Sequence, residues 1–106
     1  MCGFKMILLL MAICYILYSK SLDRFYTGIT QDSLSNRIQK HNNHSYGKHR
    51  YTAKASDWTV YLIFEAESMA HARRIELKIK KMKSAQFIRN LYAYDELKER
   101  IYLETK

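Results

Sequence analysis

Two short runs rich in tyrosine and β-branched residues stand in the first third of the chain. They cover residues 13–19 and 25–30, and the polar stretch 20–24 separates them. Tyrosine and β-branched side chains favour strands, so the pattern predicts a β-hairpin. Residues 59–65 (TVYLIFE) hold a third apolar run. Its length predicts a third strand, at the centre of a small sheet.

A helix is predicted directly after the hairpin. Asp32 is the expected N-cap, and the helix should reach about residue 42. Its inward face combines Leu34, Ile38 and His41, which are spaced i, i+4 and i+7. Residues 41–57 then lack periodicity, so a long loop with a short helical piece is expected. Structureless loops beyond ~12 to 15 residues are uncommon in compact domains, and this length hints at function.

The rest of the chain is predicted to be helical. Ser68 should cap a helix that ends near residue 82, and Ser84 should begin another; residues 95–103 suit one more amphipathic turn or two. The expected buried positions are Ala72, Ile75, Ile79, Met82, Phe87, Ile88 and Leu91. We therefore predict an α+β fold, a small three-stranded antiparallel sheet flanked by helices in the order β-β-α-β-α-α.

Composition limits the class of protein. The chain has 106 residues, no proline and three glycines, which suits one domain without linkers. The net charge of +8 favours an anionic partner, either nucleic acid or an acidic membrane surface. Cys2 and Cys14 match no metal or disulfide spacing, so a reducing, cytoplasmic setting is expected.

The amino terminus imitates a signal peptide, because residues 6–18 carry no charge. Thirteen residues fall short of the ~20 that cross a bilayer as a helix, and no cleavage pattern follows. We expect translation to start at Met11, with residues 1–10 a dispensable extension. Residues 11–92 would form the domain and 93–106 an amphipathic helical tail.

One carboxylate stands within the most basic segment. Residues 73–83 hold six Lys or Arg and a single acid, Glu76, and supply +5 of the +8. A solvated helix face with an i,i+4 pair between Glu76 and Lys80 would explain this pattern. However, the helical spacing puts Glu76 at the rim of the core, and a lone carboxylate suits Mg²⁺, which often takes one or two protein carboxylates plus phosphate oxygens.

Two further pairs could carry chemistry. Arg37 and His41 are neighbours on the first helix, where arginine could grip a phosphate and histidine could move a proton. Tyr15 and Tyr26 lie on the two hairpin strands, and Gly28 is two residues beyond Tyr26. Each of these residues also has an ordinary explanation, since surface cations and packed tyrosines are common.

Together these residues resemble a known family. Tyr15-Ile16-Leu17, Phe25 to Thr30, Asp32, Arg37 and His41 are similar to the GIY-YIG nuclease domain, closest to its short stand-alone bacterial members. The later segments Tyr51-Thr52, Trp58, 60–64 and 72–81 follow in the family's order and spacing. The departures are Ile13-Cys14-Tyr15 in place of Gly-Ile-Tyr, and Ile29 where some excision-repair relatives have lysine.

The resemblance implies an endonuclease that acts on nucleic acid, with DNA as the expected substrate, and has Mg²⁺ or Mn²⁺ as its cofactor. The metal would lie on Glu76, Arg37 would hold the phosphate, and Tyr15 or Tyr26 would be the general base, with His41 beside them. The residues expected to bind nucleic acid are Gly28, Lys48, Arg50, Lys54, Arg73, Lys80 and Lys81. Two alternatives remain at this point: a non-catalytic nucleic-acid-binding module and a protein on the membrane surface. We expect no membrane partner.

Overall fold

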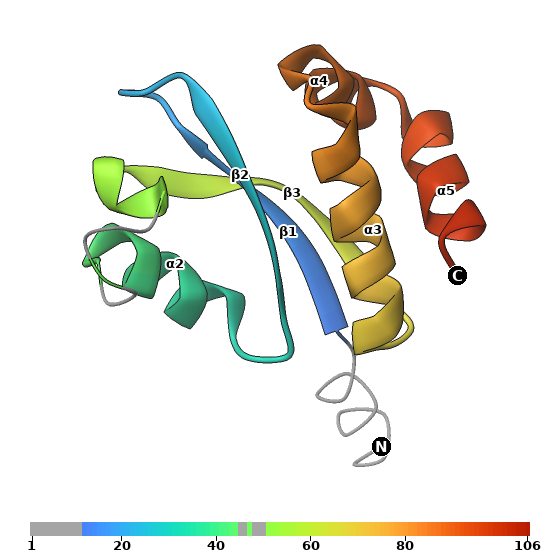
Figure 1. Ribbon diagram of the computed structural model, residues 1–106, viewed down its shortest axis with the longest axis horizontal. Helices are drawn as coiled ribbons and strands as arrows, with labels where there is room; N and C mark the ends of the chain where they lie inside the picture. Colours follow the sequence, from blue (N-terminus) through green and yellow to red (C-terminus); the bar gives the residue numbers. More distant parts are fainter. Residues whose placement is uncertain (1–11, 45–46, 48–50) are drawn as a thin grey trace.

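The computed structural model describes residues 12–44, 47 and 51–106. Three antiparallel strands form its sheet: β1 (Ala12–Ser19), β2 (Arg24–Thr30) and β3 (Trp58–Ala66), in the order β2-β1-β3 (Figure 1). The predicted hairpin and the three-stranded α+β fold are confirmed. The prediction of a central third strand was wrong, because β1 lies in the centre and β3 forms one edge.

The central position of β1 follows from its side chains. Both faces of this strand are apolar: Cys14 and Ile16 are buried on one side, Tyr15 and Leu17 on the other. A strand that is buried on both faces reads as a continuous apolar run. On β3, by contrast, the side chain of Val60 is exposed, as expected for a strand at the edge of the sheet.

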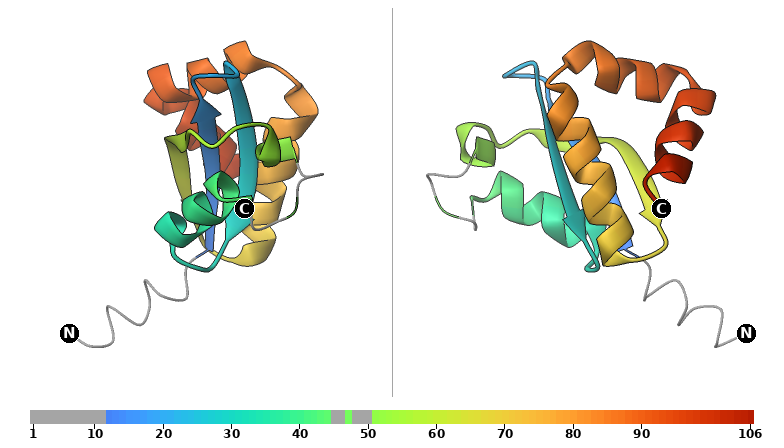
Figure 2. Two further views of the ribbon diagram at one scale, coloured as in Figure 1. Left: turned by 90° about the vertical axis from the view of Figure 1, so that its left-hand side faces the viewer. Right: turned by 45° about the vertical axis from the view of Figure 1, so that its right-hand side comes forward.

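Helices cover both faces of the sheet. α3 (Met69–Met82), α4 (Ala85–Ala93) and α5 (Asp95–Glu104) lie on one face, whereas α2 (Leu34–Asn42) and the short 3₁₀ helix η1 (Tyr51–Lys54) lie on the other (Figures 1 and 2). The larger core, on the α3 face, is built on Cys14, Ile16, Phe64, Ile75 and Leu91. The smaller core, on the α2 face, contains Tyr15, Leu17, Ala55 and Trp58.

The helix caps agree with the predictions at two of three positions. Ser68 and Ser84 accept hydrogen bonds from the third residue after each of them, as N-caps do. The N-cap of α2, however, is Ser33 rather than Asp32, since the Ser33 hydroxyl accepts from Asn36 N. Asp32, the residue before this N-cap, instead accepts a hydrogen bond from the Ser33 N–H.

The end of α3 differs from the prediction. Met82 was expected in the buried stripe, but 45% of it is exposed, because the helix ends there and the chain turns into α4. Lys83 makes this turn with φ 48° and ψ 41°, the left-handed conformation that glycine usually supplies at a helix end. A lysine in that conformation costs roughly 1 kcal/mol relative to glycine.

The predicted helical piece of the long loop is η1. The predicted extension, residues 1–10, lies outside the described residues, as do Lys48 and Arg50. Among the residues that the structure describes, none belongs to a helix long and apolar enough to cross a bilayer.

Candidate functional site

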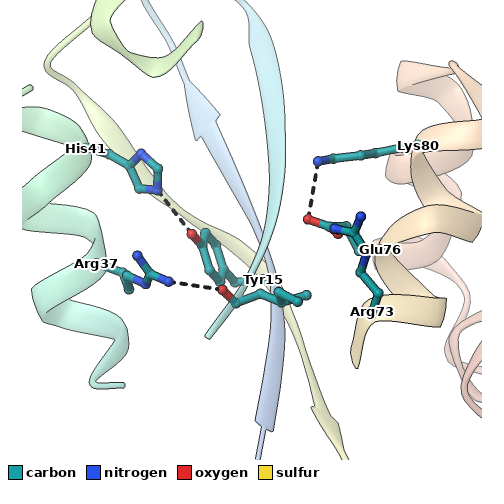
Figure 3. A network of polar contacts seen from close by, with 7 residues as sticks. Tyr15, Arg37, His41, Arg73, Glu76 and Lys80 are labelled. Atoms are coloured by element: carbon teal, nitrogen blue, oxygen red, sulfur yellow. Dashed lines mark hydrogen bonds and ion pairs between the residues drawn. The ribbon is translucent and has the colours of Figure 1, made fainter. Parts of the chain in front are cut away.

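A cleft of ≈ 400 Å³ lies at the free edge of strand β2. Its walls come from both faces of the sheet, since α2 and η1 contribute on one side and α3 on the other. All five candidate residues for catalysis line it: Tyr15, Tyr26, Arg37, His41 and Glu76. Figure 3 shows the side chains of α2 and α3 approaching the strands from opposite sides.

Gly28 leaves the space that the phenol of Tyr15 occupies. The two residues are opposite each other in the β1–β2 ladder. A Cβ added to Gly28 would lie 2.5 Å from the Tyr15 hydroxyl and 2.6 Å from Cζ, too close for any side chain. Gly28 is therefore needed where the phenol ring crosses the neighbouring strand, a close approach that only glycine permits.

The Tyr15 hydroxyl belongs to a buried polar chain. It lies 3.1 Å from His41 Nε2 (Figure 3), and His41 Nδ1 lies 2.8 Å from Thr52 Oγ1. His41 and Thr52 are 4% and 3% exposed. In the tautomer in which Nε2 accepts a hydrogen bond from the Tyr15 hydroxyl, Nδ1–H donates one to Thr52 Oγ1, so both ring nitrogens have a hydrogen-bond partner. The histidine can thus take a proton from Tyr15.

Arg37 is positioned by the end of strand β2. Its Nε donates to Thr30 Oγ1 at 3.1 Å, and its Nη2 lies 3.4 Å from the Ile29 carbonyl oxygen. Thr30 is buried and its hydroxyl also accepts from Asp32 N. These contacts keep the guanidinium at the cleft, where an arginine can bind phosphate oxygens.

Glu76 reaches the cleft from the other side of β2. Its side chain is 6% exposed, and each oxygen has one cation: Arg73 Nη1 lies 2.8 Å from Oε1 and Lys80 Nζ lies 3.2 Å from Oε2. These are the i−3 and i+4 neighbours on α3, so the predicted Glu76–Lys80 pair is present. The expected position at the rim of the core also holds, although the residue is buried there.

Tyr26 forms the wall between the two halves. Lys80 Nζ lies 5.7 Å from the centre of its ring, so the ammonium that pairs with Glu76 also faces this phenol. The ring of Tyr51 lies nearly parallel to that of Tyr26, with centroids 6.4 Å apart. The open face of the cleft is therefore aromatic and cationic.

The other residues expected to bind nucleic acid are dispersed. Lys54 lies on η1 with Nζ 5.0 Å from the centre of the Tyr51 ring, beside the cleft. Lys81 is exposed on α3 but does not line the cleft, and Arg73 is paired with Glu76. Gly28 lines the cleft, although the phenol of Tyr15 occupies the space beside it.

Thr52, Thr30 and Tyr51 belong to the site but were not predicted as site residues. Thr52 and Thr30 orient His41 and Arg37, and Tyr51 lines the wall. The Tyr51-Thr52 pair of the family resemblance was a usable signal for two of them. Thr30 belongs to the Phe25 to Thr30 run of the same resemblance, but its contact with Arg37 depends on the place where α2 packs and could not be predicted.

The residues at the cleft fit Mg²⁺ or Mn²⁺ better than a structural Zn²⁺. Among the described residues, no three His, Cys, Asp or Glu side chains come together as a ligand set. Among the described residues that line the cleft, only Glu76 offers a carboxylate, and its charge is already compensated by two cations. This fits Mg²⁺ or Mn²⁺ completed by water and substrate phosphate, and it does not fit a closed structural zinc site.

Comparison with known proteins gives one finding. A family model described as the GIY-YIG catalytic domain matches residues 11–92. Neither the curated proteins nor the solved structures yield a match. The match agrees with the resemblance noted in the sequence, and it includes every strand and the helices that line the cleft.

Proposed function

Since the chain belongs to the GIY-YIG catalytic domain family, whose members are nucleases, we propose that it is an endonuclease that hydrolyses phosphodiester bonds in DNA. Nucleic acid is its class of partner. One observation carries the proposal. Five side chains with complementary chemical roles, from β1, β2, α2 and α3, line a single cleft at the edge of β2.

Tyr15 acts as general base in this proposal. Tyrosine has an ordinary pKa near ~10, so a phenol needs help to give up its proton. His41 Nε2, 3.1 Å from the hydroxyl, is the acceptor at hand. Tyr15 then takes the proton of the attacking water, and Tyr26 lines the path of that water beside Lys80.

Arg37 binds a non-bridging oxygen of the scissile phosphate. Its anchors on Thr30 and Ile29 preorganise the guanidinium, so little reorganisation is needed as charge grows in the transition state. Lys80 and Lys54 supply sequence-independent attraction for the phosphate backbone.

Glu76 is the proposed ligand of a single Mg²⁺ or Mn²⁺. When bound, the metal neutralises charge on the phosphate and on the leaving oxygen. Arg73 and Lys80 would compete with such a metal for the Glu76 carboxylate, and the phosphates of the substrate would give both cations other partners.

A nicking assay with Mg²⁺ tests the site. Glu76→Ala should abolish turnover and still bind DNA, and Arg37→Ala should lower kcat by ~10²- to 10³-fold. Glu99→Ala and Arg100→Ala, both exposed on α5, are matched controls that should retain activity. Cleavage retained in the Glu76 variant would sink the proposed site. Wild-type protein that binds but never cleaves would make the chain a non-catalytic binding module.

The assignment of the base has its own test. Tyr15→Phe should lower kcat by ~10²- to 10⁴-fold, and its residual rate should keep rising with pH, because hydroxide is then the only base left. The kcat of Tyr26→Phe should be lower than that of the wild type, but its pH profile should keep the wild-type shape. The opposite pattern would exchange the two roles.

The substrate panel should contain single-stranded, duplex, flap and junction DNA together with RNA of the same sequences. DNA cleaved at least tenfold faster than RNA would support the proposed substrate. We place the enzyme in the cytoplasm of a bacterium and in DNA repair or recombination. Branched substrates cleaved faster than plain duplex would support that role.

A further inference from the structure

A second groove adjoins the cleft. It has a volume of ≈ 360 Å³ and lies between strand β2, the carboxyl-terminal half of α3 and the start of α4. Tyr26, Tyr51 and Lys80 line both hollows, so the groove continues the cleft along the edge of β2. A strand of nucleic acid whose phosphate lies in the cleft would run directly into it.

The floor of the groove is apolar and its rim is cationic. Phe25, Ile79 and Ile88 form the floor, whereas Arg24, Lys80 and Lys83 are the charged residues that line it. The lining contains no acidic residue among those described, in contrast to the surface hollow on α5, which is lined by Glu96, Glu99 and Glu104. This combination suits a ligand with an apolar face and a negative charge.

Arg24 and Lys83 are exposed cations that line the groove. Within the described residues, no ion pair involves Arg24 or Lys83. The cations that do pair with a carboxylate are Arg73, Lys78, Lys80, Arg89 and Lys106. Arg24 Nη1 donates to the Asp23 carbonyl oxygen at 3.3 Å, but no carboxylate among the described residues neutralises either charge, so both are available to an anion. Electrostatic complementarity marks the groove as a binding surface for a polyanion.

The backbone of Lys83 adds an independent observation. This residue is in the left-handed conformation at the end of α3, where glycine would be more stable. Residues held in such conformations cluster at functional sites. Lys83 therefore places an ammonium at the groove, at a position where a glycine would supply no charge.

We propose that the groove binds one unpaired nucleotide of the cleaved strand, next to the scissile phosphate. The inference rests on the proposed nuclease function and specifies its substrate. The base lies on Phe25, Ile79 and Ile88, and its phosphate lies between Arg24 and Lys83.

A paired duplex presents mainly sugar and phosphate outside its grooves, whereas an unpaired base offers the π-face that apolar and aromatic side chains bind. The nuclease therefore prefers DNA that is single-stranded at the cut.

Binding measured without metal separates this proposal from catalysis. The probes are a fluorescent (dT)₈, the same sugar-phosphate chain with abasic sites, and a duplex, titrated in EDTA by anisotropy. Wild-type protein should bind (dT)₈ about five- to tenfold more tightly than the abasic chain, because base stacking is lost in the latter. Equal affinity for the two probes would overturn the proposal.

Two variants locate the binding in the groove. Ala85→Trp fills it and should remove the preference for (dT)₈ while leaving duplex affinity unchanged; Ala93→Trp, at the far end of the same helix, should change neither. Lys83→Gly should raise Tm yet weaken (dT)₈ binding severalfold and reduce its salt slope by about 0.7. Lys78→Ala, on α3 and paired with Glu104, is the matched control.

The outcomes distinguish two failures. If the groove variants bind like wild type, the groove proposal fails even when the protein cleaves DNA. If they lose (dT)₈ binding but the wild-type protein cleaves no substrate, the proposed nuclease function fails and the groove is a nucleotide-binding site alone. Lower Tm with weaker binding in Lys83→Gly would count against the use of its strained backbone.

Discussion

Replacing Gly28 with alanine should damage the site and the fold together. The new Cβ would lie 2.5 Å from the Tyr15 hydroxyl, whereas carbon contacts are ordinarily ~3.5 to 4.0 Å. The ring must therefore move by about 1 Å. It is 2% exposed and bonded to His41, so it has no free direction in which to yield.

The magnitude follows from three effects. Overpacking costs about 1 to 3 kcal/mol, and a weakened Tyr15–His41 hydrogen bond about 0.5 to 1.5 kcal/mol. Alanine gains about 0.5 to 1 kcal/mol over glycine in a strand. The free energy of unfolding should fall by about 2 kcal/mol, which lowers Tm by roughly 10 °C in a domain of this size. Displacing the phenol by about 1 Å should lower kcat by about 10²-fold.

Urea unfolding in a double-mutant cycle checks this reasoning. Tyr15→Leu removes the three atoms that the new Cβ would approach most closely, which are the hydroxyl oxygen, Cζ and Cε2. In that background Gly28→Ala should stabilise the protein by about 0.5 to 1 kcal/mol, so the sign of its effect reverses. An equal loss in both backgrounds would refute the contact with Tyr15 as the cause.

Three further changes should behave as follows. Burial, followed by the nearby Glu76 carboxylate, raises the pKa of Cys14 to about 12, so in a Cys2→Ser background its thiol should not react with a disulfide reagent at pH 8 until the protein unfolds. The stability that this thiol contributes is complete below its ordinary pKa of 9.0 and falls as the pH rises toward its folded-state pKa of about 12. A thiol that reacts at once in the folded protein would contradict its burial. Lys80→Gln should tighten Mn²⁺ binding roughly 1.5- to 5-fold by electron paramagnetic resonance, because an ammonium 3.2 Å from Glu76 no longer competes, and unchanged affinity would refute that competition. Hydrogen bonds from Ser19 and Ser21 lower the pKa of Asp57, so Asp57→Asn should lower Tm at pH 7. This loss should shrink as the pH falls from the ordinary pKa of 3.8 through the lower pKa of the folded state; a loss that stays constant over that range would exclude the charge as its source.

The sequence predicted which residues form each element better than it predicted their neighbours. The runs of the hairpin and of β3 were identified from apolar side chains, and the confirmed helices from Ser68 and Ser84. Strand order could not be predicted, because β1 and β3 are both apolar runs and only tertiary packing decides which one is central. Asp32 and Ser33 are both good caps, and the chain geometry after Thr30 selects the second.

The residues of the candidate site could be collected from the sequence, but their partners could not. Spacing on a helix placed Glu76 beside Lys80, since i,i+4 neighbours need no tertiary information. The contact between Tyr15 and Gly28 depends on the register of the hairpin, and that between His41 and Thr52 on how the loop folds back. Such contacts join residues that no local pattern links.

The two halves of the cleft rest on different cores. Glu76 is carried by a helix over the larger core, which has eleven buried members among the described residues; Arg37 and His41 are carried by a helix over the smaller one, which has four. Less apolar burial makes local opening of α2 easier than opening of α3. Heating should thus separate the halves before the domain melts, and the enzyme would lose turnover reversibly at a temperature at which most of its amide protons are still protected from exchange.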